Sequence, residues 1–574
     1  MPIQHSTVTK LRSAAESENY DKTTVSLTEA LKSELSGKMF RDVDKFWDVH
    51  FEEKTWSSLT KSIWESYRDN GQCGPKNEFT CDMSEKAIRS WLDAFRDRYL
   101  NQLLQITEIT GNLQPAGERN CTGPLVRGKF CHIEEKDQFD GGLSVRQVDF
   151  FIESVEIPDC HVHKWRDVRA VGEVTSSEKK VAVKINQMIR YVREIFYAQP
   201  LRRFVHGFCL HEKHVEFWII DRAGAYSSGQ IDVMKDQEKL VRGLASYMLM
   251  SDEELGLDPV TSYDDANRCF MTILDKNKAP EKLEVFAKPL ARPETIVSRG
   301  STCFKTIDNE YLIKFSWGSG AKENEIQFLN RAKQIPDVIQ MENSGKLYEI
   351  ETHRKSFQFP DDKIWVFNAI DQTLSPGKFD ITFSDEPYMK RTLTFVKLTP
   401  VGRPLHTSVT VHQRGVTNGI LIDLDMSSLR ENENEKDLPR SITGTTRYMA
   451  LELLQAIAQK QTSLKQTYRH DLESCFYVLI VGFRIINAFL PQFEGVKELA
   501  WNLRRILFGE KGLEFGSPMD PNILYDPIIK AFDGTIEKLE VYVLDKKNND
   551  DIQTGRRGNL LVRKNSRKVA GRKK

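Results

Sequence analysis

Residues 419–452 read GILIDLDMSSLRENENEKDLPRSITGTTRYMALE, and the rest of the chain is best interpreted outward from this stretch. A short apolar run ends at Asp423, and a polar, charged segment follows it. The stretch then closes on Ala450-Leu451-Glu452. This order predicts a buried strand that presents the Asp423 carboxylate at its end, followed by a loop that is anchored back in the core.

The composition is that of a folded globular protein. Hydrophobic residues make up 40% and charged residues 29% of the 574 positions, enough for two or three domains with their own cores. Lysine and arginine total 82, as do aspartate and glutamate, so no net charge favours nucleic acid or a membrane surface. The start lacks an apolar signal region, the longest apolar run (Phe476–Phe483) cannot cross a bilayer, and the cysteines form no CxxC pair. We therefore expect an intracellular protein, cytoplasmic or nuclear, without zinc or disulfides.

Helical periodicity begins after the polar, Ser/Thr-rich residues 1–40, which we expect to fold only partly. The clearest helix starts near Ser84, with Asp82 or Ser84 as its N-cap. Its apolar face, with a spacing of three and four, consists of Ile88, Trp91, Leu92, Phe95, Tyr99 and Leu103. We interpret this helix as one that packs on the next domain.

The pattern changes to alternating strands and helix over residues 125–235. Residues 148–152 and 168–174 are predicted strands, and residues 203–210 and 214–220 are predicted to form a hairpin that turns at 211–213. Between them lies an amphipathic helix that stops at Pro200, with one face made of Ile185, Met188, Ile189, Val192 and Phe196.

Two carboxylates in this α/β region suggest a metal site. Asp149 and Glu173, on adjacent predicted strands, would suit Mg²⁺ in a nuclease of the PD-(D/E)xK kind. That arrangement needs a lysine two residues after the glutamate, where this chain has Thr175. We expect the strand register to hold the nearby lysines away from the carboxylates; these are Lys179, Lys180 and Lys184. A nuclease-like fold reused as a scaffold is thus favoured over an active nuclease.

A turn and a strand farther along could bind a nucleotide. Gly300 lies in a turn, Arg299 to Phe304, whose backbone N–H groups can cover phosphates. Lys314, on the strand that follows, can pair with the α- and β-phosphates. Because the turn has only one glycine, Lys314 can equally be an ordinary surface lysine on this evidence alone.

Taken together, these segments resemble the fungal-type protein kinase family, and residues 419–452 resemble the activation segment of a kinase. The resemblance covers about residues 130–540. It rests on the following motifs: Val171-Gly172-Glu173, Gln199-Pro200-x-Arg202-Arg203-Phe204-Val205-x-Gly207-Phe208, Trp218, Asp221-Arg222-x-Gly224, Arg299-Gly300-Ser301-Thr302, Lys314 with Ser316-Trp317, Val401-Gly402-Arg403-Pro404-Leu405, Gly419 to Asp425, Thr443-Gly444-Thr445 and His470-Asp471-Leu472-Glu473-Ser474.

The resemblance implies an enzyme that uses ATP and Mg²⁺ to phosphorylate protein Ser/Thr hydroxyls. Lys314 and the Gly300 turn would hold the phosphates, Glu325 (with Glu323 as runner-up) would position Lys314, and Asp423 would bind Mg²⁺. Asp471 would bond the backbone of the catalytic loop, cap the helix that follows, or both.

The chain departs from the family in one interval. Only residues 406–422 lie between Leu405 and Asp423, and a helix of about 20 residues alone would exceed that length. A kinase places a helix and the H-R-D-x-x-x-x-N catalytic loop there, whereas this interval contains no aspartate, and its Asn418 is too close to Asp423. We therefore expect catalysis to be impaired, and no catalytic residue is assigned. Either the protein is a pseudokinase or its recorded sequence omits a coding segment.

We predict an α+β protein, in which an α/β nuclease-like module precedes a protein-kinase-like bilobal domain with a truncated large lobe. The expected partners are a protein substrate or docking partner, without nucleic acid or membrane. The basic end is either an import element or a solvated tail. The predicted parts are residues 1–110 (polar start and helices), 111–245 (α/β module), 246–405 (linker and small lobe), 406–545 (truncated large lobe) and 546–574 (basic tail).

Overall fold

A computed structural model shows two compact units. Unit 1 contains residues 1–401 and 417–428, and unit 2 contains residues 402–416 and 429–574. Each unit is described by itself. The structure describes residues 24–72, 84–100, 126–132, 139–143, 148–158, 162–319, 325–336, 338–368, 373–377, 388–402, 448–459, 468–487, 494–508 and 523–538.

A mixed sheet forms the centre of the first half of unit 1, in the strand order β1-β9-β8-β7-β6-β4-β2, with β10 beside β8. The predicted hairpin is confirmed as the antiparallel pair β7–β8, and β6 pairs with β7 in parallel. The first predicted strand is shifted: it starts at Phe150, not at residue 148. The bounds are β1 Met39–Phe40, β2 Gly128–Cys131, β4 Phe150–Ser154, β6 Val168–Thr175, β7 Phe204–His211, β8 His214–Asp221, β9 Gly224–Ser227 and β10 Ile231–Asp232.

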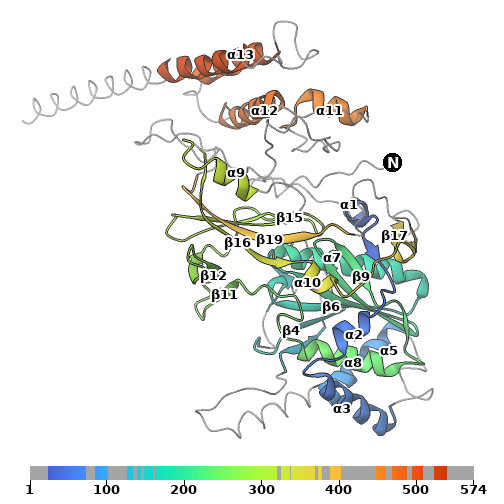
Figure 1. Ribbon diagram of the computed structural model, residues 1–574. Helices are drawn as coiled ribbons and strands as arrows, with labels where there is room; N and C mark the ends of the chain where they lie inside the picture. Colours follow the sequence, from blue (N-terminus) through green and yellow to red (C-terminus); the bar gives the residue numbers. More distant parts are fainter. Residues whose placement is uncertain are drawn as a thin grey trace, which may run out of the picture. The chain divides into compact units, whose positions relative to one another are not determined.

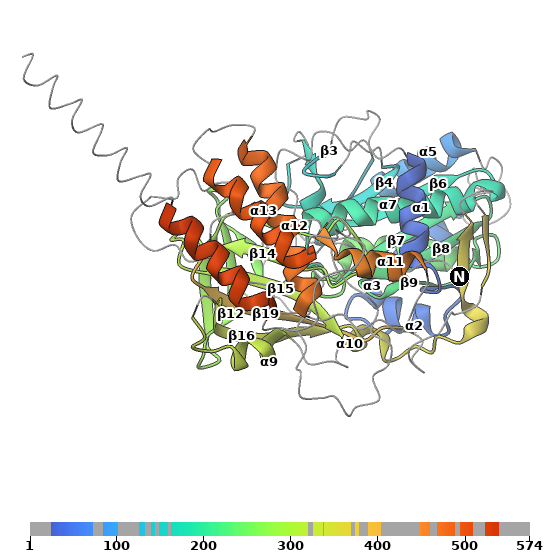
Figure 2. The same ribbon diagram turned by 90° about the horizontal axis from the view of Figure 1, so that it is seen from above.

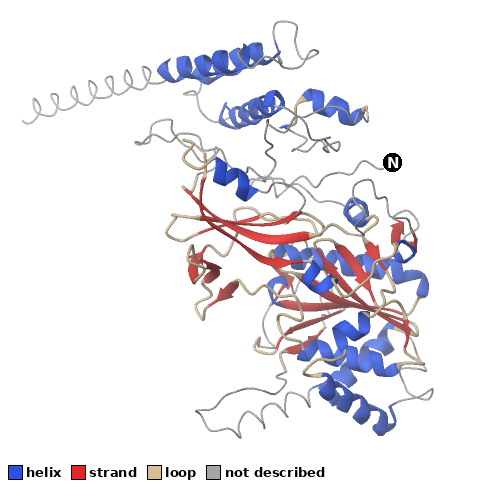
Figure 3. Cartoon of the chain, in the orientation of Figure 1, coloured by secondary structure: helices blue, strands red, loops and turns tan. Residues whose placement is uncertain are grey.

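Helices cover both faces of this sheet, as Figures 1 and 3 show. On one face lie α7 (Val181–Ala198), whose predicted apolar stripe is buried, and α1 (Thr24–Leu35). On the other face lie α2 (Phe46–Phe51), α3 (Ser57–Tyr67), α5 (Glu85–Phe95) and α8 (Gln237–Leu249). The view from above in Figure 2 shows α1 and α7 over the same sheet. Short helical turns are η2 Arg68–Gln72, η3 Arg96–Leu100, η4 Trp165–Asp167, η5 Glu178–Lys180 and η6 Asp361–Lys363.

The start of α5 agrees with the sequence-based prediction, whereas the packing of α1 does not. The Ser84 hydroxyl caps α5 by accepting a hydrogen bond from the Ala87 N–H at 3.2 Å. By contrast, the described part of residues 1–40 is well packed, because Leu27, Leu31 and Leu35 of α1 are all buried against α7. Because the apolar stripe of α1 is short and lies among polar residues, the sequence did not predict this packing.

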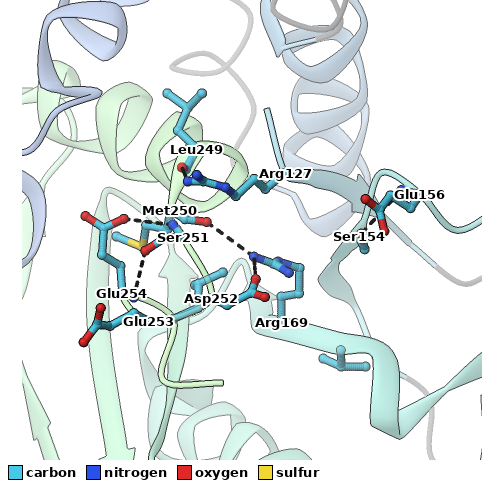
Figure 4. A network of polar contacts seen from close by, with 12 residues as sticks. Arg127, Ser154, Glu156, Arg169, Leu249, Met250, Ser251, Asp252, Glu253 and Glu254 are labelled. Carbon is cyan, nitrogen blue, oxygen red and sulfur yellow. Dashed lines mark hydrogen bonds and ion pairs between the residues drawn. The ribbon is translucent and has the colours of Figure 1, made fainter. Parts of the chain in front are cut away.

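The segment after α8 is tied down by polar contacts (Figure 4). The Arg169 guanidinium, on β6, donates to the Met250 carbonyl oxygen and pairs with Asp252 at 2.7 Å. The Ser251 N–H donates to the Glu254 carboxylate at 2.8 Å, and the Glu254 N–H donates to the Ser251 hydroxyl at 3.2 Å. The indole N–H of Trp56, just before α3, also donates to the Glu254 carboxylate. These bonds fix residues 250–256 between β6 and the N-terminal helices.

A second sheet of unit 1 has the order β14-β15-β19-β16, made of Thr302–Lys305, Leu312–Ser319, Arg391–Thr399 and Gln340–Glu349. One face of this sheet shares the core of the first sheet, because Phe315, Trp317 and Phe395 belong to the same cluster of buried residues as Phe208 and Phe217. The other face has a smaller cluster of its own, made of Leu329, Ile339, Val396 and Leu398. The remaining elements are β3 Phe139–Asp140 with β5 His163–Lys164, β11 Thr261–Tyr263 with β12 Cys269–Leu274 and β13 Pro280–Val285, β17 Trp365–Asn368 with β18 Thr373–Pro376, α9 Glu325–Arg331 and α10 Glu351–Arg354.

The described part of unit 2 is helical: α11 Leu451–Ala458, α12 Tyr468–Asn487, α13 Glu494–Phe508 and a helix over residues 523–538. Phe476 packs with Leu503 and Leu524 in its core. The anchor Glu452 pairs with Arg469, and the Glu473 carboxylate accepts the Leu451 N–H at 2.7 Å. Asp471 is not an N-cap, because α12 already begins at Tyr468. Among the described residues no helix is long and apolar enough to span a membrane.

Buried histidines should make unit 1 sensitive to acid. Burial lowers the pKa of His206 to about 3, and burial also lowers the pKa of the neighbouring His50. Since an unfolded histidine takes up a proton near pH 6.5, stability is complete above that pH and falls as the pH drops toward 3. We expect His206 to account for a loss of about 2 kcal/mol at pH 5.

Urea unfolding at pH 7.5 and at pH 5 measures this loss. His206→Gln should lose about 2 kcal/mol less than the parent between the two pH values. His132→Gln is the matched control, since the His132 side chain is 29% exposed. An equal pH dependence in His206→Gln and the parent protein would contradict the assignment.

Candidate functional site

Lys314 lies in the interior of the second sheet, near the middle of β15. It stands directly opposite Cys303 on β14 and Val396 on β19. Side chains opposite one another share a face of the sheet, so Lys314 projects to the face of Val396, which packs with Leu329 of α9. The lysine is therefore held between two neighbouring strands and under α9.

Glu325, the first residue of α9, meets Lys314 on that face. The Lys314 Nζ donates to Glu325 Oε1 at 2.8 Å, and each of the two residues is only 6% exposed. The pair that the sequence predicts is thus present. Glu325 Oε2 is buried and has no hydrogen-bond partner among the described residues. A buried pair of this kind fixes both side chains, because breaking it would leave an uncompensated charge in the interior.

Gly300 lies on the other face of the sheet. It precedes β14, is buried and has a φ of 56°, which favours glycine. A Cβ at this position would lie 2.9 Å from the Trp317 indole and 3.4 Å from Arg222 Nε. Trp317 is three residues from Lys314 on one strand, so the two side chains point to opposite faces. The structure gives Gly300 a packing role, and its contact with a phosphate stays a prediction.

The remaining predicted ligands of the nucleotide site cannot be placed. Asp423 lies outside the described residues, as do Asn418 and the whole stretch 403–447. Glu323, the runner-up to Glu325, also lies outside them.

The two carboxylates of the α/β region do come together, with a lysine between them. Lys184 Nζ lies 2.8 Å from Glu173 Oε2 and 3.0 Å from Asp149 Oδ2, and Arg89 pairs with the other Asp149 oxygen at 2.7 Å. The expectation that Lys184 would be held away is therefore wrong. It considered the strand register alone, whereas Lys184 stands on the first turn of α7 and turns back onto β6.

The charges in this cluster compensate one another. Burial and the charge of Asp149 raise the pKa of Glu173 well above its usual value. Although burial opposes it, the hydrogen bond with Glu173 and the charge of Lys184 lower the pKa of Asp149. In the part of the chain that the structure describes, no group of three or more His, Cys, Asp or Glu side chains could hold a metal ion. Nuclease chemistry thus stays a prediction.

A buried ionic network connects the first sheet with α10, and the spacing of the sequence did not reveal it. Asp221, at the end of β8, accepts two hydrogen bonds from Arg354, of 2.7 and 2.9 Å, and lies 2.8 Å from His353 Nε2. Its Oδ1 also accepts the N–H groups of Ala223 and Gly224. The only sequence signal was the motif Asp221-Arg222-x-Gly224, which indicated no partner.

Arg222 and Arg202, in the same group of motifs, hold carbonyl groups in the interior. Arg222 Nη1 donates to the carbonyl oxygens of Thr295 and Ile296 at 2.7 and 3.2 Å. Arg202 donates to four carbonyl oxygens, and its burial lowers its pKa to about 9. Arg222 therefore fixes the connection that leads to Gly300 and β14, whereas Arg202 ties β6 and β7 to the segment after α8.

A sequence model of the family described as fungal protein kinase matches residues 147–413 and, in a second segment, residues 407–483. The two segments together span more than half of the 574 residues. No curated protein and no solved structure matches the chain.

Proposed function

Because the chain belongs to the fungal protein kinase family, we propose that it binds ATP with Mg²⁺ in a kinase-type small lobe and that its phosphoryl transfer to protein Ser/Thr is impaired. The observation that carries the proposal is the buried pair between Lys314 and Glu325, with its separation of 2.8 Å. The same pair between a strand lysine and a helix glutamate must be in place in protein kinases before phosphates are held.

The residues present fit the nucleotide. The Lys314 ammonium offers a fixed positive charge to phosphate oxygens, and Glu325 orients it from α9. Asp423 would provide a carboxylate for Mg²⁺, which prefers oxygen ligands. Bound ATP would supply the phosphoryl group, and Mg²⁺ would offset its charge.

The interval before Asp423 supports the second half of the proposal. No residue in 406–422 is an aspartate, so this interval offers no carboxylate to accept the proton of a substrate hydroxyl. The two segments of the family match also meet there, at residues 407–413. Together these observations favour a break in the kinase pattern at the catalytic loop. The competing proposal is a pseudokinase that docks a protein partner without catalysis.

A thermal-shift titration of the full chain with ATP and Mg²⁺ tests nucleotide binding. At a hundredfold excess over Kd, bound ligand should stabilise the protein by about 3 kcal/mol. Lys314→Ala and Asp423→Ala should each lose this shift, whereas Lys282→Ala, on β13, should keep it. A shift that persists in Lys314→Ala, or no shift in a cooperatively melting parent protein, would overturn the proposal.

Phosphoryl transfer is measured separately, with ATP labelled at the γ-phosphate and a mixture of Ser/Thr peptides as acceptors. We expect incorporation no greater than that of Lys314→Ala. Incorporation that is Mg²⁺-dependent and lost in Lys314→Ala would show an intact kinase and refute the impairment.

A further inference from the structure

The helix over residues 523–538, the last helix that the structure describes, has two apolar faces. On one face, Leu524 and Ile528 pack with Phe476 in the core of unit 2. The other face, which we call the exposed stripe, consists of side chains three and four residues apart that are 36–54% exposed; they are Tyr525, Ile529, Phe532 and Ile536. Single exposed apolar residues are common on protein surfaces, but an unbroken row of them marks an interaction site.

An acidic band runs along one edge of the exposed stripe. Asp526, Asp533 and Glu537 are all exposed, and their spacing of seven and four residues places them on one side of the helix. At about 100° of turn per residue, this side lies next to the stripe and away from the face that packs in the core. Lys530 lies on the same side and offsets only part of the negative charge. A segment that covers the stripe therefore meets mainly carboxylates along this edge.

The acidic band disfavours a second copy of this chain as the cover. In an antiparallel, two-fold symmetric pair of these helices, the same edge of each helix meets its counterpart. The carboxylates of one acidic band would then lie beside those of the other, and like charges repel. A basic segment with a few apolar side chains fits this surface better.

The end of the chain contains such a segment. Residues 556–574, here called the basic segment, include no acidic residue, and Leu560-Leu561-Val562 stands between Arg556-Arg557 and Arg563-Lys564. About 17 residues, 539–555, separate the basic segment from the end of the helix. A flexible linker of that length spans about 20–25 Å, whereas the stripe from Tyr525 to Ile536 is about 17 Å long. The basic segment can therefore reach the whole stripe.

We propose that the basic segment docks on the exposed stripe of its own chain. Leu560, Leu561 and Val562 cover the apolar side chains, and the flanking arginine and lysine side chains pair with the acidic band. Because the two parts belong to one chain, the effective concentration is in the millimolar range, so individually weak contacts suffice. Docking withholds these basic side chains from other partners. The inference does not depend on nucleotide binding, since Lys314 belongs to unit 1.

Photo-cross-linking of the full chain tests where the basic segment lies. The photoreactive residue p-benzoyl-L-phenylalanine replaces Leu561, and peptide mass spectrometry locates the cross-link. We expect a cross-link to residues 523–538 within the monomer band of a denaturing gel. Ile529→Ser combined with Phe532→Ser should lower its yield about tenfold, because docking loses its apolar contacts.

Trp501→Ser is the matched control, because Trp501 is an apolar side chain of α13 that is 68% exposed and lies outside the stripe. It should leave the yield unchanged. All of these substitutions are at exposed positions, and a cooperative thermal transition in each variant verifies that it is folded. The proposal is overturned if the cross-link joins unit 1 or a second chain, if none forms, or if the stripe variant does not lower the yield.

An exchange of charges tests the acidic band. Asp533→Lys combined with Glu537→Lys should lower the yield of the same cross-link about tenfold at low salt, since the basic side chains then meet like charges. Adding Arg563→Glu and Lys564→Glu should restore it. A yield that the first pair leaves unchanged, or that the second pair fails to restore, would overturn the assignment of the acidic band.

Discussion

Replacing Asp221 with asparagine should lower the free energy of unfolding of unit 1 by about 3–5 kcal/mol. Asp221, Arg354 and the backbone N–H groups of Ala223 and Gly224 meet in the interior, and both charged residues are 0% exposed. Without the carboxylate, the Arg354 guanidinium would remain buried without a counter-charge. Urea or thermal unfolding of the parent protein and the variant measures the effect.

Two comparisons make this prediction specific. Asp264→Asn removes a solvent-screened ion pair with Arg268 and should cost much less than Asp221→Asn. The double variant Asp221→Asn with Arg354→Met should be more stable than Asp221→Asn alone, because it removes the stranded charge. A cost for Asp221→Asn as small as that of Asp264→Asn would contradict the assignment of this network.

The same network predicts a loss of stability in acid. Although burial alone would raise it, the charge of Arg354 and hydrogen bonds from His353 and Arg354 lower the pKa of Asp221 far below its usual value. A carboxylate with a lowered pKa stabilises the fold fully above its unfolded value of about 3.9 and loses that contribution as the pH falls below it. The loss should be absent in Asp221→Asn.

Replacing Lys314 with methionine should have the second large effect, again about 3–5 kcal/mol of stability. Methionine fills much of the lysine volume but leaves the Glu325 carboxylate buried, with its Oε1 as unpartnered as Oε2 already is. The same variant should lose the stabilisation by ATP and Mg²⁺. Chemical unfolding with and without the nucleotide measures both effects in one experiment.

A second substitution separates the two effects. Lys314→Met combined with Glu325→Leu removes both charges and should recover most of the lost stability. It should not recover the response to ATP, because no ammonium group remains to meet the phosphates. Recovery of both properties would mean that Lys314 matters only as the partner of Glu325.

Local patterns predicted much of the first sheet and of the pair at Lys314. The period of α7, the polar turn between β7 and β8 and the Ser84 cap all depend on residues that are close to one another in the sequence. The Lys314–Glu325 pair could be predicted for a similar reason, since only 11 residues separate the partners and the family pattern provides their roles.

The features that the sequence concealed depend on long-range contacts. Asp221 and Arg354 are 133 residues apart, and neither has a local pattern that requires the other. Lys184 reaches Glu173 only because α7 lies against β6, a relation that strand register alone does not describe. In the same way, the sequence does not reveal that Trp317 is buried in one cluster with Phe208 and Phe217 of the first sheet.

The most direct test of the nucleotide site is to ask which lysine lies beside the phosphates of bound ATP. An acyl-phosphate derivative of ATP transfers its acyl group to a nearby lysine amine, forming an amide and releasing ATP. Peptide mass spectrometry of the labelled full chain should find the amide on Lys314, and excess unmodified ATP with Mg²⁺ should suppress it. Labelling that ATP does not suppress, or labelling of other lysines while Lys314 stays unmodified, would contradict a kinase-type nucleotide site.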